Sequence, residues 1–107
     1  MEAARYIVVL ITSDSIEESD HIARTLLEKK MVACVNIVRG IDSFFWWQGR
    51  LDSARENLLI AKTKASLLPE IVDAVRKRHS YDVPEVIALP IIDGNQDYLE
   101  WLEQSLA

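Results

Sequence analysis

Short apolar runs alternate with amphipathic stretches along this chain, and their periods predict strands and helices in a definite order. The first strand is expected from Tyr6 to Thr12, where apolar and β-branched residues follow one another without a break, as in a buried central strand. A helix should follow, with one apolar stripe that ends near Lys29-Lys30. Ser15 and Glu18 have the spacing of a capping box at its first turn.

The middle of the chain, from Val32 to Lys64, has no helical period. Within it we expect a turn at Arg39-Gly40 and three extended segments, namely Met31–Val38, Ile41–Trp47 and Glu56–Thr63. Each arm of such a hairpin could run roughly 45 Å at about 3.3 Å per residue, whereas a helix of about 15 residues spans only about 22 Å. The far half of the hairpin should therefore project beyond the core.

The last third of the chain predicts a helix, a strand and a second helix. Ser66 should cap the first of these helices, and Pro69 suits its first turn. The segment from Val83 to Ile92 should be an edge strand, because its prolines cannot donate to a ladder. Asn95 should cap the short final helix. The order β-α-β-β-α-β plus a C-terminal helix predicts one α+β domain over 1–107, with the ferredoxin-like split βαβ fold.

Four consecutive aromatic residues lie in the projecting half of the predicted hairpin: Phe44, Phe45, Trp46 and Trp47. Side chains alternate along a strand, so two rings should lie on each face. An uncovered sheet with aromatics on both faces is an exposed apolar patch of the kind that marks interfaces. We therefore expect this segment to contact other copies of the chain, although the rings could instead fold back on the chain's own helices.

Composition narrows the functional classes. The 107 residues carry a formal net charge of −5, and the only basic cluster is Arg76-Lys77-Arg78, so nucleic acid is an improbable partner. The single cysteine, Cys34, excludes an internal disulfide and is expected to be buried in a strand. With no apolar stretch long enough for a membrane span, a cytoplasmic location is expected. No nucleophile, phosphate-loop or zinc-protease motif occurs, which favours a non-enzymatic protein.

Several short motifs, in order over nearly the whole chain, resemble the CutA divalent-cation tolerance family. They are Ala33-Cys34-Val35-Asn36-Ile37; Ser43, Phe45, Trp47 and Gly49; Glu56 with Lys62-Thr63; His79 and Tyr81; the run from Pro84 to Pro90; and Tyr98-Leu99 with Trp101. The resemblance implies a ferredoxin-like homotrimer, similar in build to the PII signalling proteins. It also implies a role in tolerance to divalent cations, copper above all.

The chain departs from the family pattern at positions that bear on metal binding. Phe45 stands where a tyrosine is usual, and Ser80 stands where many members have proline. Ile11 and Arg78 replace a cysteine and a second histidine found in some bacterial members. Copper(II), or another divalent cation, is therefore expected to bind weakly.

Two groups of candidate site residues follow. His79, with Asp82 and Glu85 close in sequence, could supply a weak metal site, and a purely structural histidine is the alternative. Lys62, Tyr81 and Glu85 fall within the family motifs and could line a pocket for a small anion or nucleotide, or simply form an ion pair. His21 lies off the apolar stripe and should face solvent.

The combined prediction is a cytoplasmic, trimeric protein of divalent-cation tolerance that binds metal weakly. The main alternative is a PII-like signalling trimer that senses a small anionic ligand or nucleotide. An acylphosphatase-like hydrolase would need an arginine in the loop after the first strand, where the chain has Thr12-Ser13-Asp14-Ser15. An RNA-binding domain shares the order of elements, but the acidic charge and the aromatic positions disfavour it.

Overall fold

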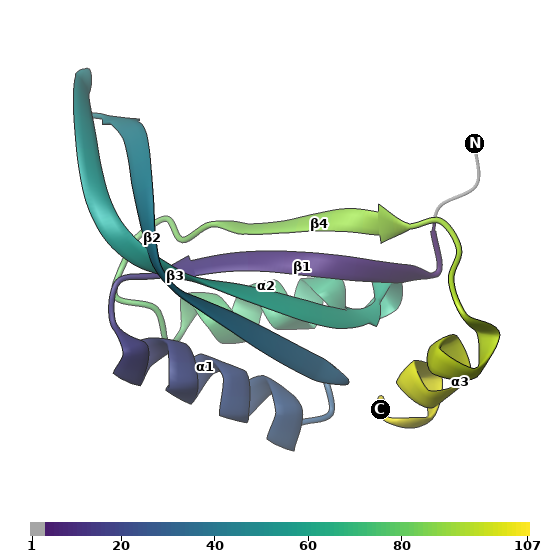
Figure 1. Ribbon diagram of the computed structural model, residues 1–107. Coiled ribbons are helices and arrows are strands. Elements are labelled where there is room, and N and C mark those ends of the chain that lie inside the picture. The colour runs from purple at the N-terminus through teal and green to yellow at the C-terminus, as the bar shows by residue number, and fades with distance from the viewer. Residues whose placement is uncertain (1–3) are drawn as a thin grey trace.

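The computed structural model describes residues 4–107, and their arrangement is an antiparallel sheet with two helices packed on one face (Figure 1). The strands are β1 (Tyr6–Ser13), β2 (Cys34–Trp47), β3 (Arg50–Lys64) and β4 (Val86–Ile91), in the sheet order β2-β3-β1-β4. The helices are α1 (Ile16–Glu28), α2 (Leu68–Arg76) and α3 (Gln96–Gln104). The predicted α+β class, with its order of elements, is confirmed. No helix in residues 4–107 is long and apolar enough to cross a membrane.

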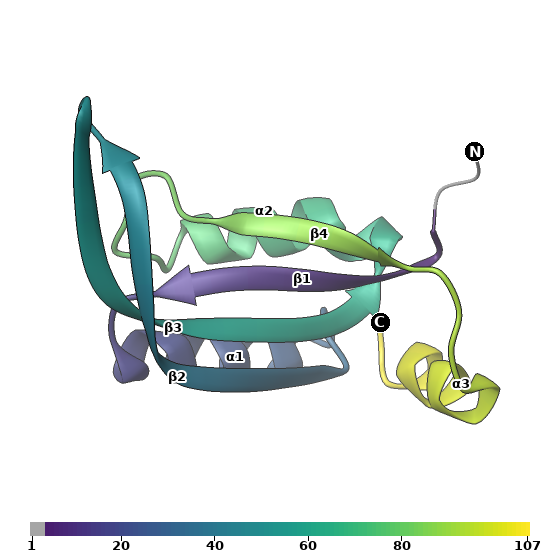
Figure 2. The same ribbon diagram turned by 45° about the horizontal axis from the view of Figure 1, so that its top comes forward.

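The hydrophobic core lies between the sheet and the helices α1 and α2. Alternate residues of β1, namely Ile7, Val9 and Ile11, point into it and are almost fully buried. Leu59 and Ala61 do the same from β3. The opposite face of the sheet carries no helix, as both views of the ribbon show (Figures 1 and 2). The helices α1 and α2 thus cover one face of the sheet only.

The distal half of the β2–β3 hairpin bends away from the helices and stands up over the uncovered face of the sheet (Figure 2). The prediction of a projecting hairpin is confirmed, but the turn expected at Arg39-Gly40 is wrong. Instead, β2 continues through a bulge in which Arg39 and Gly40 together face Asn57. Gly40 has φ +68°, a left-handed conformation that glycine adopts without strain.

Local signals set most element boundaries. The Ser15 side chain accepts a hydrogen bond from the Glu18 amide, and Asn95 caps α3 in the same way through the Asp97 amide. Ser66 does not cap α2, contrary to the prediction, because it lies in a 3₁₀ turn, Ala65–Leu67, that leads directly into the helix. Pro69 occupies the first turn of α2 as expected.

The C-terminal edge strand is shorter than predicted. β4 begins at Val86 rather than Val83 and pairs only with β1, so it does lie at an edge. Val83 is left exposed in the preceding loop. A two-residue turn, Gln48-Gly49, closes the hairpin with positive φ at both positions, which is the backbone of a type I′ turn and matches the strand twist.

Candidate binding cleft

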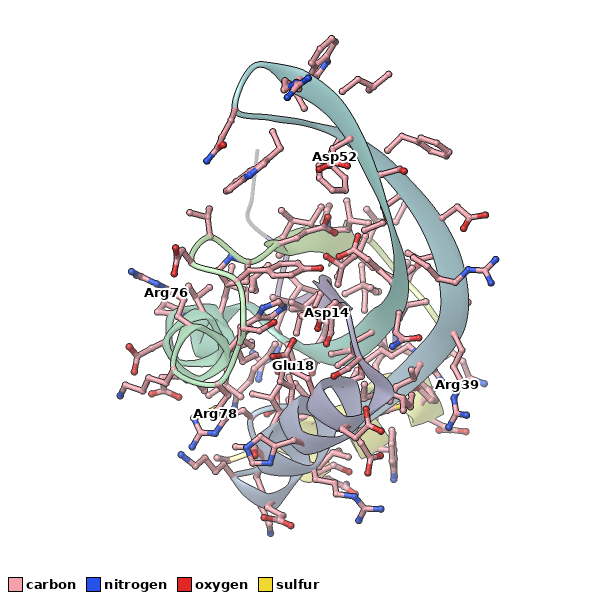
Figure 3. All side chains as sticks on the ribbon, turned by 90° about the vertical axis from the view of Figure 1, so that its left-hand side faces the viewer. Asp14, Glu18, Arg39, Asp52, Arg76 and Arg78 are labelled. Carbon is pink, nitrogen blue, oxygen red and sulfur yellow. The ribbon has the colours of Figure 1, made fainter. Side chains whose placement is uncertain are left out.

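A cavity of about 800 Å³ lies under the bent hairpin. The hairpin forms its roof, and the loop from Ser80 to Glu85 forms much of its wall, with Thr12 at the end of β1. Its volume falls within the range of about 300–1,000 Å³ typical of small-molecule sites. Figure 3 looks onto this end of the molecule and shows Asp52 within the arch of the hairpin.

His79 fixes the loop that forms the wall of the cleft. Its side chain is fully buried. Nε2 lies 2.6 Å from the Thr12 carbonyl oxygen, to which it donates, and Nδ1 accepts the Tyr81 amide at 3.0 Å. These contacts fit the neutral ring with its proton on Nε2. Both nitrogens are thus occupied within the chain, and a metal could reach the ring only by replacing one of these bonds.

Glu18 holds the same loop from the side of α1. One of its carboxylate oxygens accepts the Ser80 amide at 2.7 Å, and the other accepts the Ser13 hydroxyl at 2.8 Å. The second oxygen also lies 3.7 Å from Nδ1 of His79. Hydrogen bonds to a carboxylate are stronger than neutral ones. Asp14 and Glu18, both labelled in Figure 3, place negative charge near Tyr81.

Tyr81 and Glu56 form the innermost polar contact of the cleft. The Tyr81 hydroxyl donates to Glu56 Oε2 at 2.9 Å. The Tyr81 ring also packs against the His79 ring in a tilted arrangement, with centroids 4.7 Å apart and an interplanar angle of 49°. Burial and the bond to Glu56 raise the pKa of Tyr81 well above its usual value. The hydroxyl is therefore protonated throughout the neutral range and acts only as a donor to this carboxylate.

Glu85 faces the same region from the start of β4. Burial raises the pKa of the Glu85 carboxyl, and the charge of Glu56 raises it further. Two ionised carboxylates in one cleft disfavour each other unless a cation separates them. Tyr81 and Glu85 both line the cleft.

Lys62 lies apart from this cleft. It sits opposite Val8 and Cys34 in the sheet, and its ammonium group bonds to the Asn36 side chain, 4.0 Å from the Cys34 sulfur. Lys62 therefore belongs to the opposite end of β3 and does not line the cleft of the single chain, so a ligand pocket of Lys62, Tyr81 and Glu85 stays a prediction. Cys34 is half-buried rather than enclosed, and His21 is exposed as expected.

Among the described residues 4–107, those that line the cleft include four acids, Asp52, Glu56, Asp82 and Glu85, and no lysine or arginine. Within residues 4–107, none of the four forms a salt bridge, because the ion pairs there involve other acids. Arg39, Arg76 and Arg78 lie at the periphery of Figure 3. Across that same span, no group of three or more metal-binding side chains converges on a point, so His79, Asp82 and Glu85 as a metal site stay a prediction.

Two of these acids were not predicted as site residues. Glu56 had a signal, because it is the first residue of the apolar segment ENLLIAKT and a carboxylate beside a buried strand is unusual. Glu56 is only 7% exposed. Asp52 had no such signal in the sequence, because its place under the arch depends on the bend of the hairpin.

The four hairpin aromatics divide between two sides. Phe45 pairs with Asp52 and Trp47 with Arg50, and both rings line the cleft on the concave side. Phe44 and Trp46 belong to the alternate set of positions and are 74% exposed. The expectation of two rings on each face is confirmed. That other copies of the chain cover them stays a prediction.

The fold and the cleft place this chain among small α+β proteins with a bent, projecting hairpin, and comparison with known proteins gives its family. Residues 7–105 match the family described as CutA1 divalent ion tolerance protein. The chain belongs to this family, as the sequence motifs predicted.

Named relatives agree with that assignment. The chain is 50% identical over 99 residues to "Protein CutA 1, chloroplastic" of Oryza sativa, covering 92% of this chain and 56% of the relative. It is 43% identical over 98 residues to "Divalent-cation tolerance protein CutA" of Archaeoglobus fulgidus, covering 92% and 95%. The chain thus spans about half the length of the chloroplastic relatives and nearly all of the archaeal one.

Solved structures show the same fold. CutA1 from Oryza sativa superposes with a TM-score of 0.94 at 47% identity, covering 98% of this chain and 96% of that one. The divalent cation tolerance protein of Thermus thermophilus gives 0.93 at 43% identity, covering 95% and 99%. The Archaeoglobus fulgidus structure, with a TM-score of 0.91 at 42% identity and coverage of 94% and 97%, is described as periplasmic. The names of the relatives therefore span more than one compartment.

Proposed function

We propose that this chain is a homotrimeric, non-enzymatic protein of divalent-cation tolerance that binds divalent cations, copper(II) among them, weakly and reversibly at the cleft. The observation that carries the proposal is the set of four carboxylates in a cavity without a lysine or arginine. Such a cavity attracts cations of any kind. The names of the relatives support a role in cation tolerance.

Asp82 and Glu85 are the metal ligands that the geometry favours, because both are exposed at the wall of the cleft. Carboxylates alone bind copper less well than imidazole does. His79 would add nitrogen only after giving up its bond to Thr12 or Tyr81. A weak site that keeps exchangeable water follows from these donors. The proposed cytoplasmic location rests on the sequence alone.

Self-association is supported by the surfaces that a single chain leaves uncovered. The convex side of the hairpin exposes Phe44, Trp46 and Leu51, which are 68–74% exposed. The helix-free face of the sheet adds Val38, Ile87 and Leu89, each about half exposed. Apolar patches of this kind usually mark interfaces. We expect Phe44–Trp47 to lie at contacts between copies, and the number three comes from the family resemblance.

The proposal is tested by titrating copper(II) calorimetrically into the wild type and an Asp82→Asn/Glu85→Gln double variant. The wild type should bind in the micromolar range or more weakly, and the double variant should bind at least several-fold less tightly. Glu100→Gln, an exposed substitution on α3, is the matched control and should leave binding unchanged. Nanomolar binding, or binding that only His79→Ala abolishes, would contradict the assignment of these ligands.

A PII-like role in sensing a small anion or nucleotide was the main alternative. An anionic ligand would need positive charge in the cleft, whereas Lys62 lies elsewhere and four carboxylates line the cavity. The geometry of this cleft therefore favours the cation over the anion. Trimer assembly and cation binding together remain the proposed function.

A further inference from the structure

We propose that Asp93-Gly94 is a site of spontaneous covalent modification, where the aspartate isomerises to isoaspartate, and that the product loosens the start of α3. Both residues belong to the segment 92–95, which joins the end of β4 to the start of α3. In Figure 1 this segment lies at the opposite end of the sheet from the projecting hairpin, so its chemistry is independent of the cleft.

The reaction needs only the chain and water. The Gly94 backbone nitrogen bonds to Cγ of the Asp93 carboxyl group, the nitrogen loses its proton, and one carboxyl oxygen leaves as water, which closes a succinimide ring. Another water molecule then opens the ring. Attack at Cγ returns aspartate, whereas attack at the main-chain carbonyl carbon of Asp93 gives isoaspartate, whose main chain runs through Cβ and Cγ. No atom is gained or lost overall, and no group is oxidised or reduced.

The two reacting groups already lie together. The Gly94 amide nitrogen is 2.8 Å from Asp93 Oδ1, to which it donates. This contact folds the carboxyl group back over the next peptide bond, whose nitrogen is the attacking atom. Gly94 has no side chain to shield that nitrogen, and a Cβ there would meet only the Leu99 side chain, 3.9 Å away.

Ring closure also requires the backbone of the aspartate to rotate, and the segment 92–95 permits this. The segment belongs to no helix or strand, and its residues are exposed in the single chain. Within residues 4–107, no backbone hydrogen bond joins Asp93 or Gly94 to another residue, because the ladder between β1 and β4 ends at Ile91. The glycine adds its own conformational freedom.

Another aspartate has the same contact but not the same freedom. The Ser53 amide nitrogen lies 2.7 Å from Asp52 Oδ1. Both residues, however, are paired with β2, where they face Phe44 and Phe45, so the ladder holds their backbone in place. We therefore expect isomerisation at Asp93 and not at Asp52.

Isoaspartate at position 93 would insert the Cβ methylene group into the main chain just before α3. Asn95 caps this helix, because its side chain accepts a backbone amide of the first turn at 3.0 Å. A displaced Asn95 would leave that amide without its acceptor. The far end of the helix stays anchored by the buried Leu102 and by the bond between Glu103 and Arg5. The first turn of α3 should therefore open more often, while the last turn stays in place.

The test is to age the full chain in its native assembly at physiological temperature and neutral pH. Trypsin releases residues 79–107 as one peptide, because no lysine or arginine follows Arg78, and electron-transfer fragmentation locates isoaspartate within it. A protein isoaspartate methyltransferase with a labelled methyl donor measures the product independently. Isoaspartate should accumulate at Asp93 and stay absent from Asp52, which trypsin releases in residues 51–55.

Two variants separate this reaction from general ageing. Gly94→Ala shields the nitrogen with a methyl group, so isoaspartate at Asp93 should form several-fold more slowly. Asp93→Glu keeps the negative charge, but its longer side chain would have to close a larger ring, so the product should be absent. Hydrogen exchange in the first turn of α3 should become faster on ageing of the wild type and stay constant in aged Asp93→Glu.

Three outcomes would contradict the proposal. Wild type that forms isoaspartate at Asp93 only after unfolding in urea, or not at all, would overturn it, because the assembled fold would then protect the site. Equal rates at Asp93 and Asp52 in the native assembly would overturn it as well, since local structure would not select the site. Unchanged exchange in α3 of the isomerised protein would overturn the proposed effect on the helix.

Discussion

At the scale of single residues, the chain uses its polar side chains to hold one loop in place. His79, Ser80 and Tyr81 are each bonded to a different part of the molecule, namely Thr12, Glu18 and Glu56. These three contacts join the wall of the cleft to β1, α1 and β3. The shape of the cleft therefore depends on a few hydrogen bonds, two of them partly buried.

His79 and His21 offer a matched pair of positions for testing how much the hydrogen bonds of the cleft wall contribute to stability. His79→Ala leaves the Thr12 carbonyl and the Tyr81 amide without their partners and opens a cavity, so the free energy of unfolding should fall by about 2–4 kcal/mol. His21→Ala, at an exposed position on α1, should change it by less than about 0.5 kcal/mol. Urea unfolding of both variants measures the difference. Equal stability of the two would show that the His79 contacts contribute little.

Glu85 should destabilise the folded chain at neutral pH. Because burial and Glu56 raise its pKa in the folded state, the ionised form is disfavoured there. That penalty is present above the folded pKa and is relieved as the pH falls through it. Glu85→Gln should raise the free energy of unfolding at pH 7, on the order of 0.5 kcal/mol for so exposed a group.

The gain from Glu85→Gln should disappear below about pH 4.3, the ordinary glutamate value, where the wild-type carboxyl is protonated in both states. Urea unfolding at pH 7 and pH 4 gives the comparison, with Glu100→Gln as the control. A gain of the same size at both pH values would mean that packing, and not charge, is responsible.

At the scale of the elements, the bulge in β2 decides which aromatic rings face the cleft. Val38 points to the uncovered face of the sheet. Because Arg39 and Gly40 together lie opposite the single residue Asn57, Ile41 points to that same face. Phe45 and Trp47 therefore lie on the concave side. Without the extra residue, alternation would place Phe44 and Trp46 there instead.

Gly40→Ala tests the bulge. A Cβ at this position would meet nothing within 4 Å, but φ is +68°, so the cost is backbone strain of about 1 kcal/mol. Gly94→Ala places its Cβ 3.9 Å from Leu99 without positive φ and should change stability by less than about 0.5 kcal/mol. Thermal unfolding compares the two. A Gly40→Ala variant as stable as the wild type would show that the bulge relaxes without cost.

The sequence predicted the elements better than the cleft. Helix caps at Ser15 and Asn95 are local signals, and the apolar run of β1 identifies a central strand without further information. The bulge at Gly40 looked like a turn, because a glycine after a β-branched run suits either. The presence of Asp52, Glu56 and Glu85 in the lining of one cleft depends on the bend of the hairpin, which the sequence does not predict. The distance of Lys62 from this cleft follows from strand register, which cannot be inferred from the motifs alone.

At the scale of the whole molecule, the projecting hairpin leaves a large apolar surface of the single chain exposed. Its convex aromatics have no cover within the described part of the chain, and the sheet beneath them is open on one face. In the proposed function, assembly and cation binding would both involve this hairpin, because its aromatics are expected at contacts between copies and its concave side roofs the cleft. Trp47, at its concave side, is 54% exposed in one chain.

Trp47→Ala should shift the protein from trimer toward monomer or aggregate. Truncation of an interface aromatic costs about 2–4 kcal/mol of association free energy. Trp101→Ala is the matched control, because Trp101 is also partly exposed but lies on α3 against Tyr98. Sedimentation equilibrium at low micromolar concentration reports the mass of each. A wild-type monomer of 12.2 kDa, or a Trp47→Ala trimer, would contradict the proposed assembly.

The strand order has a consequence for the time course of folding. β1 is made first, yet its partners are β3 and β4, and Tyr6 pairs with Ile91, 85 positions later. During synthesis, the central strand must therefore wait for β3, which ends at Lys64, to gain its first partner and for β4 to gain its second, whereas the β2–β3 hairpin can close as soon as it emerges. Distant pairings form slowly. Pulsed hydrogen exchange during refolding should protect the amides of the hairpin before those of Val9 and Ile11, and simultaneous protection would show that the sheet forms in one step.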